Sequence, residues 1–396
     1  MKKLLSLIAA ALLSLCIVPF TACNDGRDGT NGTNGEDGVG IERVYINDDG
    51  ELIVVLTDGK ELNAGKTDIY EGLYYSEIIE EGEVTAYSVR SIGNLSTGKI
   101  EIPSTYKGKP VTEIGEGAFL SCKLLREVTI PDSVTTICRY AFENCSNLAE
   151  LSLGKGIEKI GDVAFGYCIS LTAVTIPSSV RYIGSDAFSG CTALKDVRIE
   201  EGVERMGRSV FSGCERLEEI TFPESLKEVG IDYEYTDGGY TISIVTDGDY
   251  SMVGMFMNCG SLKRVHLPEQ FPEIPEHFFS GCFALEEVYL GKSITKIGYS
   301  SFYLINAMQS LVIPKSVKEV ASYAFYHVNS LQDVYYEGSE EEWNAIKINR
   351  NNEISGYDPD TGMFTNGTTR LYFYSETQPE SGSNCWHYVD GQPVKW

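Results

Sequence analysis

The sequence predicts an elongated solenoid in which short β-rich coils stack on one another. The main observation is a fixed period, because a phenylalanine followed three residues later by cysteine recurs every 23 residues. The first five phenylalanines of this series are Phe119, Phe142, Phe165, Phe188 and Phe211. After one interval of 45 residues the same phase resumes at Phe256 and continues to Phe325. A constant period of this length is the sequence signature of stacked structural repeats.

Each repeat contains one short strand and one turn, seen most clearly between Ala164 and Gly184. Val174 and Ile176 are separated by one residue, which places both side chains on the same face of a strand. Pro177 is predicted to end that strand, and Gly184 to permit the turn into the next coil. A single coil cannot bury its own apolar face, so stacking supplies most of the stability and the two ends need caps.

Nine units share this phase, and a tenth, degenerate unit precedes them. Ile100 and Ile102 match Val128 and Ile130 of the next unit once five extra residues at 106–110 are allowed. The interval of 45 residues equals one repeat plus a 22-residue insertion within 231–252. We therefore assign residues 89–336 to a solenoid of about nine to ten coils, with the insertion at 231–252.

The repeat reads Ala-Phe-x-x-Cys-x-x-Leu-x-x-Val-x-Ile-Pro-x-Ser-Val-x-x-Ile-Gly, and it resembles the BspA-like leucine-rich repeats, or leucine-rich repeats of type 5, of bacterial cell-surface proteins. The resemblance covers roughly residues 95–336. It implies a leucine-rich-repeat solenoid that is a right-handed, curved, β-rich superhelix. It also implies a surface role, since several members of that family take part in adhesion to host matrix or to other cells.

Residues 1–22 have the three zones of an export signal, with two lysines, an uncharged run over residues 4–18 and a short polar end. Phe20-Thr21-Ala22-Cys23 resembles a bacterial lipobox, although Phe20 stands where leucine is usual. The resemblance implies lipidation of Cys23 and a position at the bacterial cell surface or the outer face of a membrane. A secreted protein without lipid, or an uncleaved anchor, is the alternative.

Residues 23–40 are a predicted spacer, in which glycine occupies every third position from Gly26 to Gly38 and proline is absent. Triplets without imino acids favour a flexible spacer over a trimerising, collagen-like stalk, so we expect a monomer, with a trimer as the alternative. From residue 41 the pattern changes to alternating apolar residues around Asn47-Asp48-Asp49-Gly50 and Asp58-Gly59. This alternation predicts a small β-hairpin module or N-terminal cap, which we assign to residues 41–88.

Residues 337–396 are predicted to cap the last coil. Ser339 and Glu342 form a capping-box pattern at the start of a helix that is predicted to run to Ile348, with Trp343 as its anchor. Aromatic residues alternate around Asp390-Gly391, which predicts a terminal hairpin over the last coil.

The charge of the chain excludes some partners. There are 32 Lys and Arg residues against 57 Asp and Glu residues, a formal net charge of -25. Such a chain repels nucleic acid and anionic lipid headgroups, so membrane contact is expected only through a lipid on Cys23. The hydrophobic content of 42% nevertheless indicates a folded protein rather than an acidic disordered one.

Seven of the eleven cysteines occupy one column of the repeat. Neighbouring coils separate them by roughly 4.8 Å, longer than the Cβ separation of about 3.8 Å in a disulfide, so we expect free buried thiols. Ile305 and Val328 replace cysteine in the same column, which favours packing over metal binding or redox chemistry. Cys138 and Cys385 lie outside the column and are expected to be lone thiols, with a disulfide as the alternative.

No motif for catalysis or metal binding is found. None of the four histidines has metal-ligand spacing or neighbours a nucleophile pattern. The run Asp358-Pro359-Asp360-Thr361-Gly362 begins like a calcium loop, but Thr369 stands where a bidentate glutamate would close it, which favours a turn. We therefore expect no metal, no cofactor and no enzymatic activity.

The outward residues of the repeat strands form the expected binding face. They are mostly small, polar or acidic in the first coils and more aromatic and apolar after the insertion. The candidate binding residues are Arg264, His266, Glu287, Tyr289, Asp333 and Tyr335. Exposed tyrosine flanked by charge is typical of contact hot spots. The alternative is that these rings only cover strand edges near the C-terminal cap.

We expect a non-enzymatic recognition or adhesion protein that binds an extracellular protein or glycan through this face. The alternative function is that of a passive envelope or assembly protein, in which the solenoid is a spacer.

Overall fold

The computed structural model describes residues 41–46, 51–56, 59–66, 72–93, 98–230, 235–237, 240–242, 254–349, 357–358, 363–364, 369–379 and 384–396. The predicted signal peptide, Cys23 and the glycine-rich spacer lie outside these ranges. The chain divides into two compact units, Met1–Glu71 and Gly72–Trp396. None of the helices within the described ranges has the length and apolar character needed to span a membrane.

The first unit contains a three-stranded antiparallel sheet of β1 (Ile41–Ile46), β2 (Glu51–Leu56) and β3 (Glu61–Lys66). The division between the units differs from the boundary predicted at residue 88. β4 (Leu73–Glu80) and β5 (Glu83–Ile92) form a hairpin in the second unit, where β5 pairs in parallel with β8 (Lys109–Ile114). This hairpin therefore lies against the first coil, in a different unit from the β1–β3 sheet.

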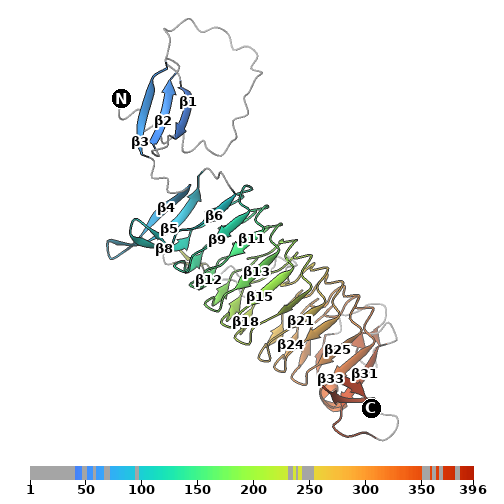
Figure 1. The fold of residues 1–396 in the computed structure, drawn as a ribbon. Helices are drawn as coiled ribbons and strands as arrows, with labels where there is room; N and C mark the ends of the chain where they lie inside the picture. The colour runs from blue at the N-terminus through green and yellow to red at the C-terminus, as the bar shows by residue number, and fades with distance from the viewer. Residues whose placement is uncertain are drawn as a thin grey trace, which may run out of the picture. The chain divides into compact units, whose positions relative to one another are not determined.

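The second unit is a stack of coils that follow one another in sequence order (Figure 1). Each coil contributes a strand to a front face, on which the Val-x-Ile segment of the repeat lies. The front-face strands are β6 (Lys99–Glu101), β9 (Glu127–Thr129), β11 (Glu150–Ser152), β13 (Ala173–Ile176), β15 (Asp196–Ile199), β17 (Glu219–Thr221), β21 (Arg264–His266), β23 (Glu287–Tyr289), β25 (Ser310–Ile313) and β27 (Asp333–Tyr336).

A back face is built from strands of two residues, which pair in parallel in two sheets. Together with β8 they are β10 (Thr136–Ile137), β12 (Lys159–Ile160), β14 (Tyr182–Ile183), β16 (Arg205–Met206) and β18 (Glu228–Val229), then β22 (Glu273–Ile274), β24 (Lys296–Ile297), β26 (Glu319–Val320) and β28 (Lys347–Ile348).

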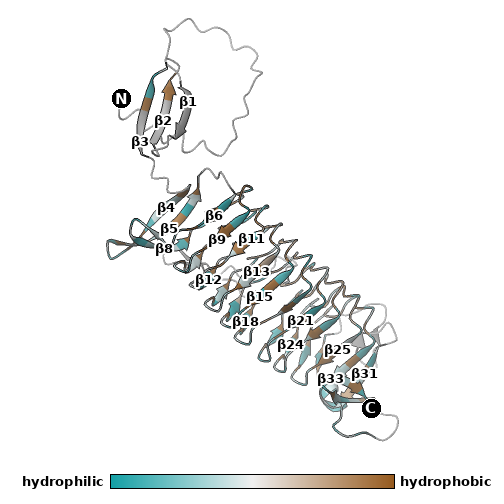
Figure 2. Ribbon diagram, viewed as in Figure 1, coloured by the Kyte–Doolittle hydropathy of each residue, from teal (hydrophilic) through white to brown (hydrophobic). Residues whose placement is uncertain are grey.

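The register repeats from coil to coil. Val174 pairs with Val197 and Ile176 with Ile199, one repeat apart. Along β13 the side chains of Ala173 and Thr175 are exposed, whereas those of Val174 and Ile176 are buried. The strands of Figure 2 accordingly carry hydrophobic and hydrophilic bands side by side. The inward and outward positions predicted for this strand are confirmed.

A column of phenylalanine rings fills the interior between the two faces. Successive rings from Phe119 to Phe279 stack with centroid distances of 4.7 to 6.1 Å and interplanar angles of 12° or less. Phe302 tilts by 40° against Phe279 and then stacks on Phe325. Offset stacking of this kind adds about 0.5–1.5 kcal/mol per pair to the stabilisation from burial.

The cysteine column contributes hydrogen bonds as well as packing. The thiol of Cys145 donates to the carbonyl oxygen of Phe119 at 3.0 Å, and that of Cys191 donates to the carbonyl of Phe165 at 3.2 Å. Cys168, Cys214, Cys259 and Cys282 make the same contact with the preceding coil. Cys138, Cys385 and all seven column cysteines are free thiols. Cysteine therefore fits this position because it is small and apolar and also donates to a neighbouring carbonyl.

Carboxylates at one turn position also join consecutive coils. Asp132 accepts a hydrogen bond from the backbone N–H of Lys155 at 2.7 Å, and Glu201 accepts from the N–H groups of Glu224 and Ser225 at 3.1 Å. Glu224 and Glu269 accept from the next coil in the same way. Part of the acidity of the chain therefore satisfies backbone donors that strand pairing leaves free.

The role predicted for Gly184 is wrong in one respect. The backbone of Gly184 is not in the left-handed region, which is occupied instead by Asp186, with φ 56°, and by Val163 one coil earlier, with φ 54°. A Cβ atom on Gly184 would lie 2.4 Å from the backbone nitrogen of Asp162 in the preceding coil. Glycine is required there because two backbones approach closely, not because the chain turns sharply.

The insertion interrupts the back face while the front face continues. β17 pairs with β21, and Glu219 is aligned with Arg264 although 45 residues separate them. Phe211 also stacks on Phe256 across this interval. The interval therefore contains one coil plus an insertion, as predicted. Within the insertion, β19 (Tyr235–Asp237) and β20 (Tyr240–Ile242) form an antiparallel pair.

The degenerate first unit is confirmed by strand pairing. β6 pairs with β9, and this pairing aligns Ile100 with Val128. The extra residues form a turn in which β7 (Thr105–Tyr106) pairs with β8. Lys107 and Gly108 at its tip both have positive φ values, of 47° and 76°.

The C-terminal cap extends the front face beyond the last repeat. β27 pairs in parallel with β31 (Arg370–Tyr374), which is followed in the sheet by β32 (Cys385–Val389) and β33 (Gln392–Lys395). β32 and β33 form the predicted hairpin, with positive φ values at Asp390 and Gly391.

The predicted capping box is present at the start of α2 (Glu340–Asn344), and Trp343 is buried. The helix is shorter than predicted, because Lys347–Ile348 leaves it to pair with β26. β29 (Tyr357–Asp358) and β30 (Met363–Phe364) form an antiparallel pair, and residues 359–362 of the calcium-like run lie outside the described ranges.

The thiol column predicts a specific alkaline destabilisation. Burial raises the pKa of Cys191 from 9.0 to about 12. Above pH 9.0 the unfolded chain therefore releases a proton that the folded chain retains, and stability is lost as the pH rises toward the folded-state pKa. Each thiol contributes at most about 1.4 kcal/mol per pH unit.

Urea unfolding of residues 24–396 between pH 8 and 10.5 measures this slope, with Cys191→Val as the comparison because Val328 occupies the same column. The variant should lose less stability than the wild type over that interval. Equal slopes would show that Cys191 ionises as readily in the folded chain as in the unfolded one.

Candidate functional site

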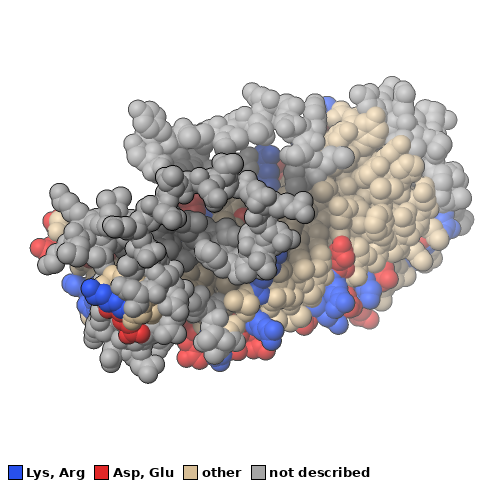
Figure 3. All heavy atoms as spheres, turned by 90° about the horizontal axis from the view of Figure 1, so that it is seen from above, with Lys and Arg blue, Asp and Glu red and all other residues tan. Residues whose placement is uncertain are grey.

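Several charged side chains along the front face form ion pairs between neighbouring coils. Lys99 lies 2.7 Å from Glu127, and Glu218 lies 3.4 Å from Lys195 and 3.3 Å from Lys263. In Figure 3 basic and acidic side chains lie next to one another along the visible surface. Such exposed pairs contribute about 0–1 kcal/mol each.

Four of the six candidate binding residues are exposed on the front face. Arg264 and His266 project from β21, and Glu287 and Tyr289 from β23. These two strands are paired, with Arg264 opposite Glu287 and His266 opposite Tyr289. The structure therefore brings these four side chains together in two adjacent coils.

Tyr335 is not part of an exposed face, and its prediction as an outward binding residue is wrong. Its side chain is buried, with 6% of its surface accessible. β31 lies beside β27, which stacks Tyr372 on Tyr335 at 5.4 Å, and Trp386 lies at the same distance from Tyr335. The expectation failed because residues 370–374 extend the sheet although they lack the repeat sequence.

Asp333 also forms ion pairs with residues of the C-terminal cap. Its carboxylate lies 3.2 Å from Arg370 and 2.8 Å from Lys395, and only 16% of its side chain is accessible. For Asp333 and Tyr335 the alternative interpretation, that these groups cover strand edges near the cap, is the correct one.

His266 and Tyr289 form one aromatic surface on the exposed part of the face. Their rings stack with centroids 4.3 Å apart and an interplanar angle of 13°. The Tyr289 hydroxyl donates to Glu269, and Lys292 lies 3.6 Å from the same carboxylate. The hydrogen bond from Tyr289 and the charge of Lys292 lower the pKa of Glu269, and burial followed by this bond raises the pKa of Tyr289. The phenol therefore remains protonated and its ring is held in a fixed orientation.

The hydrogen-bonded ladder of the front face is interrupted between β11 and β13, between β15 and β17, and between β23 and β25. Two of these interruptions coincide with grooves. The groove at β15 and β17 has a volume of about 480 Å³, and that at β23 and β25 has a volume of about 410 Å³. The second groove adjoins the exposed candidate residues.

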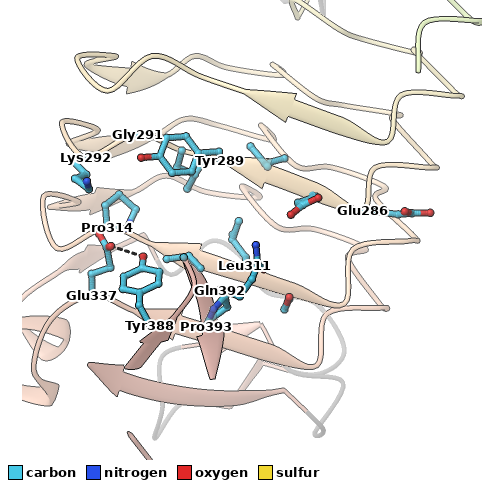
Figure 4. Close-up of a pocket in the computed structure, with 16 residues that line it drawn as sticks. Glu286, Tyr289, Gly291, Lys292, Leu311, Pro314, Glu337, Tyr388, Gln392 and Pro393 are labelled. Carbon is cyan, nitrogen blue, oxygen red and sulfur yellow. Dashed lines mark hydrogen bonds between the residues drawn. The ribbon is translucent and has the colours of Figure 1, made fainter. Parts of the chain in front are cut away.

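We call this second cavity the terminal groove, because the C-terminal hairpin forms one of its walls (Figure 4). One wall of the groove is β23, from which Tyr289 contributes, and the opposite wall is the hairpin, which contributes Tyr388 and Pro393. Leu311 and Val312 of β25 line the groove between these walls. The groove therefore combines two repeat coils with a segment from outside the repeat.

Tyr388 is fixed by a hydrogen bond of 2.6 Å from its hydroxyl to Glu337, drawn in Figure 4. Burial and this bond raise the pKa of Tyr388, so it too remains a neutral phenol. The sequence did not predict Glu337, Tyr388 and Pro393 as site residues, because only the strand pairing of the cap brings them to the front face. The aromatic alternation of the hairpin was the one available signal.

The described ranges contain no group of three or more metal-ligating side chains in contact. Burial lowers the pKa of His277, whose ring lies against Tyr299. The lining of the terminal groove combines the rings of Tyr289 and Tyr388 with the carboxylates of Glu286, Glu287 and Glu337.

Stacked 23-residue coils, two parallel strand faces and continuous phenylalanine and cysteine columns define a leucine-rich-repeat solenoid. The chain belongs to the BspA type leucine-rich repeat family. The family model, described as "BspA type Leucine rich repeat region (6 copies)", matches residues 112–233 and 252–350. Family membership indicates a surface or protein-interaction role, and no enzyme family is indicated.

Several solved structures are similar to this chain. A leucine-rich repeat protein of T. pallidum is 24% identical, with 61% of this chain and 91% of that chain covered and a TM-score of 0.41. The pneumococcal vaccine antigen PcpA is 20% identical over 78% and 93% of the two chains, with a TM-score of 0.39.

A leucine-rich cell surface protein of Faecalibacterium prausnitzii is 18% identical over 77% and 97%, with a TM-score of 0.35. No curated protein matches the chain. Because these TM-scores are below 0.5, the family assignment rests on the family model and the repeat geometry.

Proposed function

We propose that this protein is a lipid-anchored bacterial surface protein that recognises an extracellular protein or glycan with the C-terminal half of its front face. The observation that supports this most directly is the terminal groove beside four exposed, aromatic and charged side chains. Aromatic rings held rigidly at the edge of a cavity are typical of binding hot spots, because they bury area at little cost in entropy.

Rigidity strengthens this proposal. Tyr289 is held by its bond to Glu269 and by stacking on His266, and Tyr388 is held by Glu337. Tyr289 keeps 37% of its surface accessible and Tyr388 keeps 40%. A face prepared in this way loses little side-chain freedom when a partner binds.

The anchoring part of the proposal rests on the N-terminal sequence. The lipobox-like run ending at Cys23, followed by a glycine-rich spacer, would tether the folded units at the outer face of a membrane. A surface position also agrees with family membership.

A binding screen tests the recognition function. Residues 24–396 are applied to arrayed extracellular-matrix proteins and glycans, beside Tyr289→Ala and the matched control Tyr167→Ala, whose ring is 53% exposed outside the front-face strands. We expect saturable binding to at least one arrayed molecule. Tyr289→Ala should weaken this binding about tenfold or more, because it removes a hot-spot ring, and Tyr167→Ala should leave it unchanged.

Tyr335 is unsuitable for this comparison, because its replacement would disturb the buried packing of the cap. A hit of equal strength with both single variants would place the contact elsewhere. The absence of any hit at tens of micromolar would favour the alternative function, a passive envelope spacer.

Detergent phase partitioning of the full chain expressed in bacteria tests the lipid anchor. The wild type should enter the detergent phase and Cys23→Ser should not, because the serine hydroxyl is not a substrate for thioether lipidation. Metabolic labelling with a tagged fatty acid gives an independent reading. Labelling of the Cys23→Ser variant at wild-type level would exclude Cys23 as the attachment site.

A further inference from the structure

The terminal groove has the composition of a site for a positively charged side chain. Tyr289 and Tyr388 project from its two walls, and Figure 4 shows Pro314 between the two rings and Glu337 beside Tyr388. The faces of tyrosine rings carry partial negative charge and attract ammonium and guanidinium groups.

The charges around the groove favour the same ligand. Three carboxylates line it, those of Glu286, Glu287 and Glu337, against one cation, Lys292. Lys292 is already 3.6 Å from Glu269, which does not line the groove. Among the described residues, Glu286 and Glu287 form no ion pair, and Arg264, the cation whose charge acts on both, is bonded to Glu219. An incoming cation would therefore add neutralising charge beside these two carboxylates.

Glu337 can accept a second bond in this arrangement. One of its oxygens accepts the hydroxyl of Tyr388 at 2.6 Å. A carboxylate offers about four lone-pair positions, so further positions remain for a guanidinium or ammonium donor. A cation lying between the rings would therefore meet an aromatic face and a carboxylate together.

The protein builds the same arrangement with one of its own lysines next to the groove. The Nζ atom of Lys395 lies 4.7 Å from the centroid of the Tyr372 ring and 2.8 Å from Asp333. Its pKa is raised by Asp333 and Tyr372 despite the opposing effect of burial, which shows that these groups favour the charged form. Tyr388 and Glu337 repeat this combination of ring and carboxylate, and within the described ranges no lysine forms an ion pair with Glu337.

We propose that the terminal groove binds an arginine or lysine side chain from a basic segment of a protein partner, with the cation between Tyr289 and Tyr388 and against Glu337. This inference rests on the proposed recognition function and names the chemical class of its ligand. A sulfated or otherwise anionic glycan is repelled by the same carboxylates, and a neutral glycan could hydrogen-bond to them but would neutralise none of their charge.

Isothermal titration of residues 24–396 with hexa-arginine tests the inference, with hexa-glutamate and maltohexaose as comparison probes at physiological ionic strength. We expect saturable binding of hexa-arginine alone. Glu337→Gln and Tyr289→Ala should each weaken it about tenfold, in the range of one cation-π or charge contact, whereas Tyr289→Phe should retain it because the ring remains.

Glu150→Gln is the matched control, because it removes an exposed front-face carboxylate on β11, away from the groove. The inference would be overturned if Glu150→Gln and Glu337→Gln weakened hexa-arginine binding equally while Tyr289→Ala left it unchanged. Attraction to net charge alone would then explain the binding. Binding of maltohexaose without hexa-arginine would also overturn it and identify a neutral glycan site. Thermal unfolding of each variant confirms that it is folded.

The two proposals fail in different ways. If the array screen gives a hit that depends on Tyr289 while hexa-arginine does not bind, the recognition function stands and the cationic ligand is excluded. If hexa-arginine binds through Tyr289 and Glu337 while no arrayed molecule does, the ligand class is supported and the extracellular ligands tested are excluded.

Discussion

Close contact between the backbones of successive coils is the constraint on which the other features depend. At Gly184 the chain approaches the preceding coil so closely that no Cβ atom fits. The same spacing stacks the phenylalanine rings and brings six of the seven column thiols within hydrogen-bond distance of a carbonyl one coil earlier. Because every coil supplies packing surface and hydrogen-bond partners to its neighbour, the apolar columns remain continuous through the repeat. The two ends lack a neighbouring coil and must be closed by other segments.

The ends are also where the chain departs from its repeat and where the candidate site forms. At the C-terminus, β31 and the β32–β33 hairpin continue the front face with unrelated sequence. This cap buries Tyr335 and pairs Asp333, and its hairpin then forms one wall of the terminal groove. A segment needed to protect the last coil thus also supplies Tyr388 to the site, which connects stability and recognition in one structural element.

The fold could be predicted almost completely from the sequence, because a 23-residue period fixes coil length, strand register and the inward columns together. The candidate site could be predicted in part. Arg264, His266, Glu287 and Tyr289 follow from the repeat and are exposed. Tyr335 and the contribution of Tyr388 do not follow, since both depend on a pairing between β27 and a strand that has no repeat pattern. The role of Gly184 was missed because proximity to another coil leaves no local sequence signal.

Equilibrium unfolding of Gly184→Ala beside Gly260→Ala tests this account most directly. A Cβ atom at Gly184 would meet the backbone of Asp162 at 2.4 Å, whereas one at Gly260 would meet nothing within 4 Å. The account predicts a loss of about 1–3 kcal/mol for Gly184→Ala, the usual cost of overpacking, and little change for Gly260→Ala. Equal stability of the two variants would contradict the claim that backbone contact between coils sets the structure.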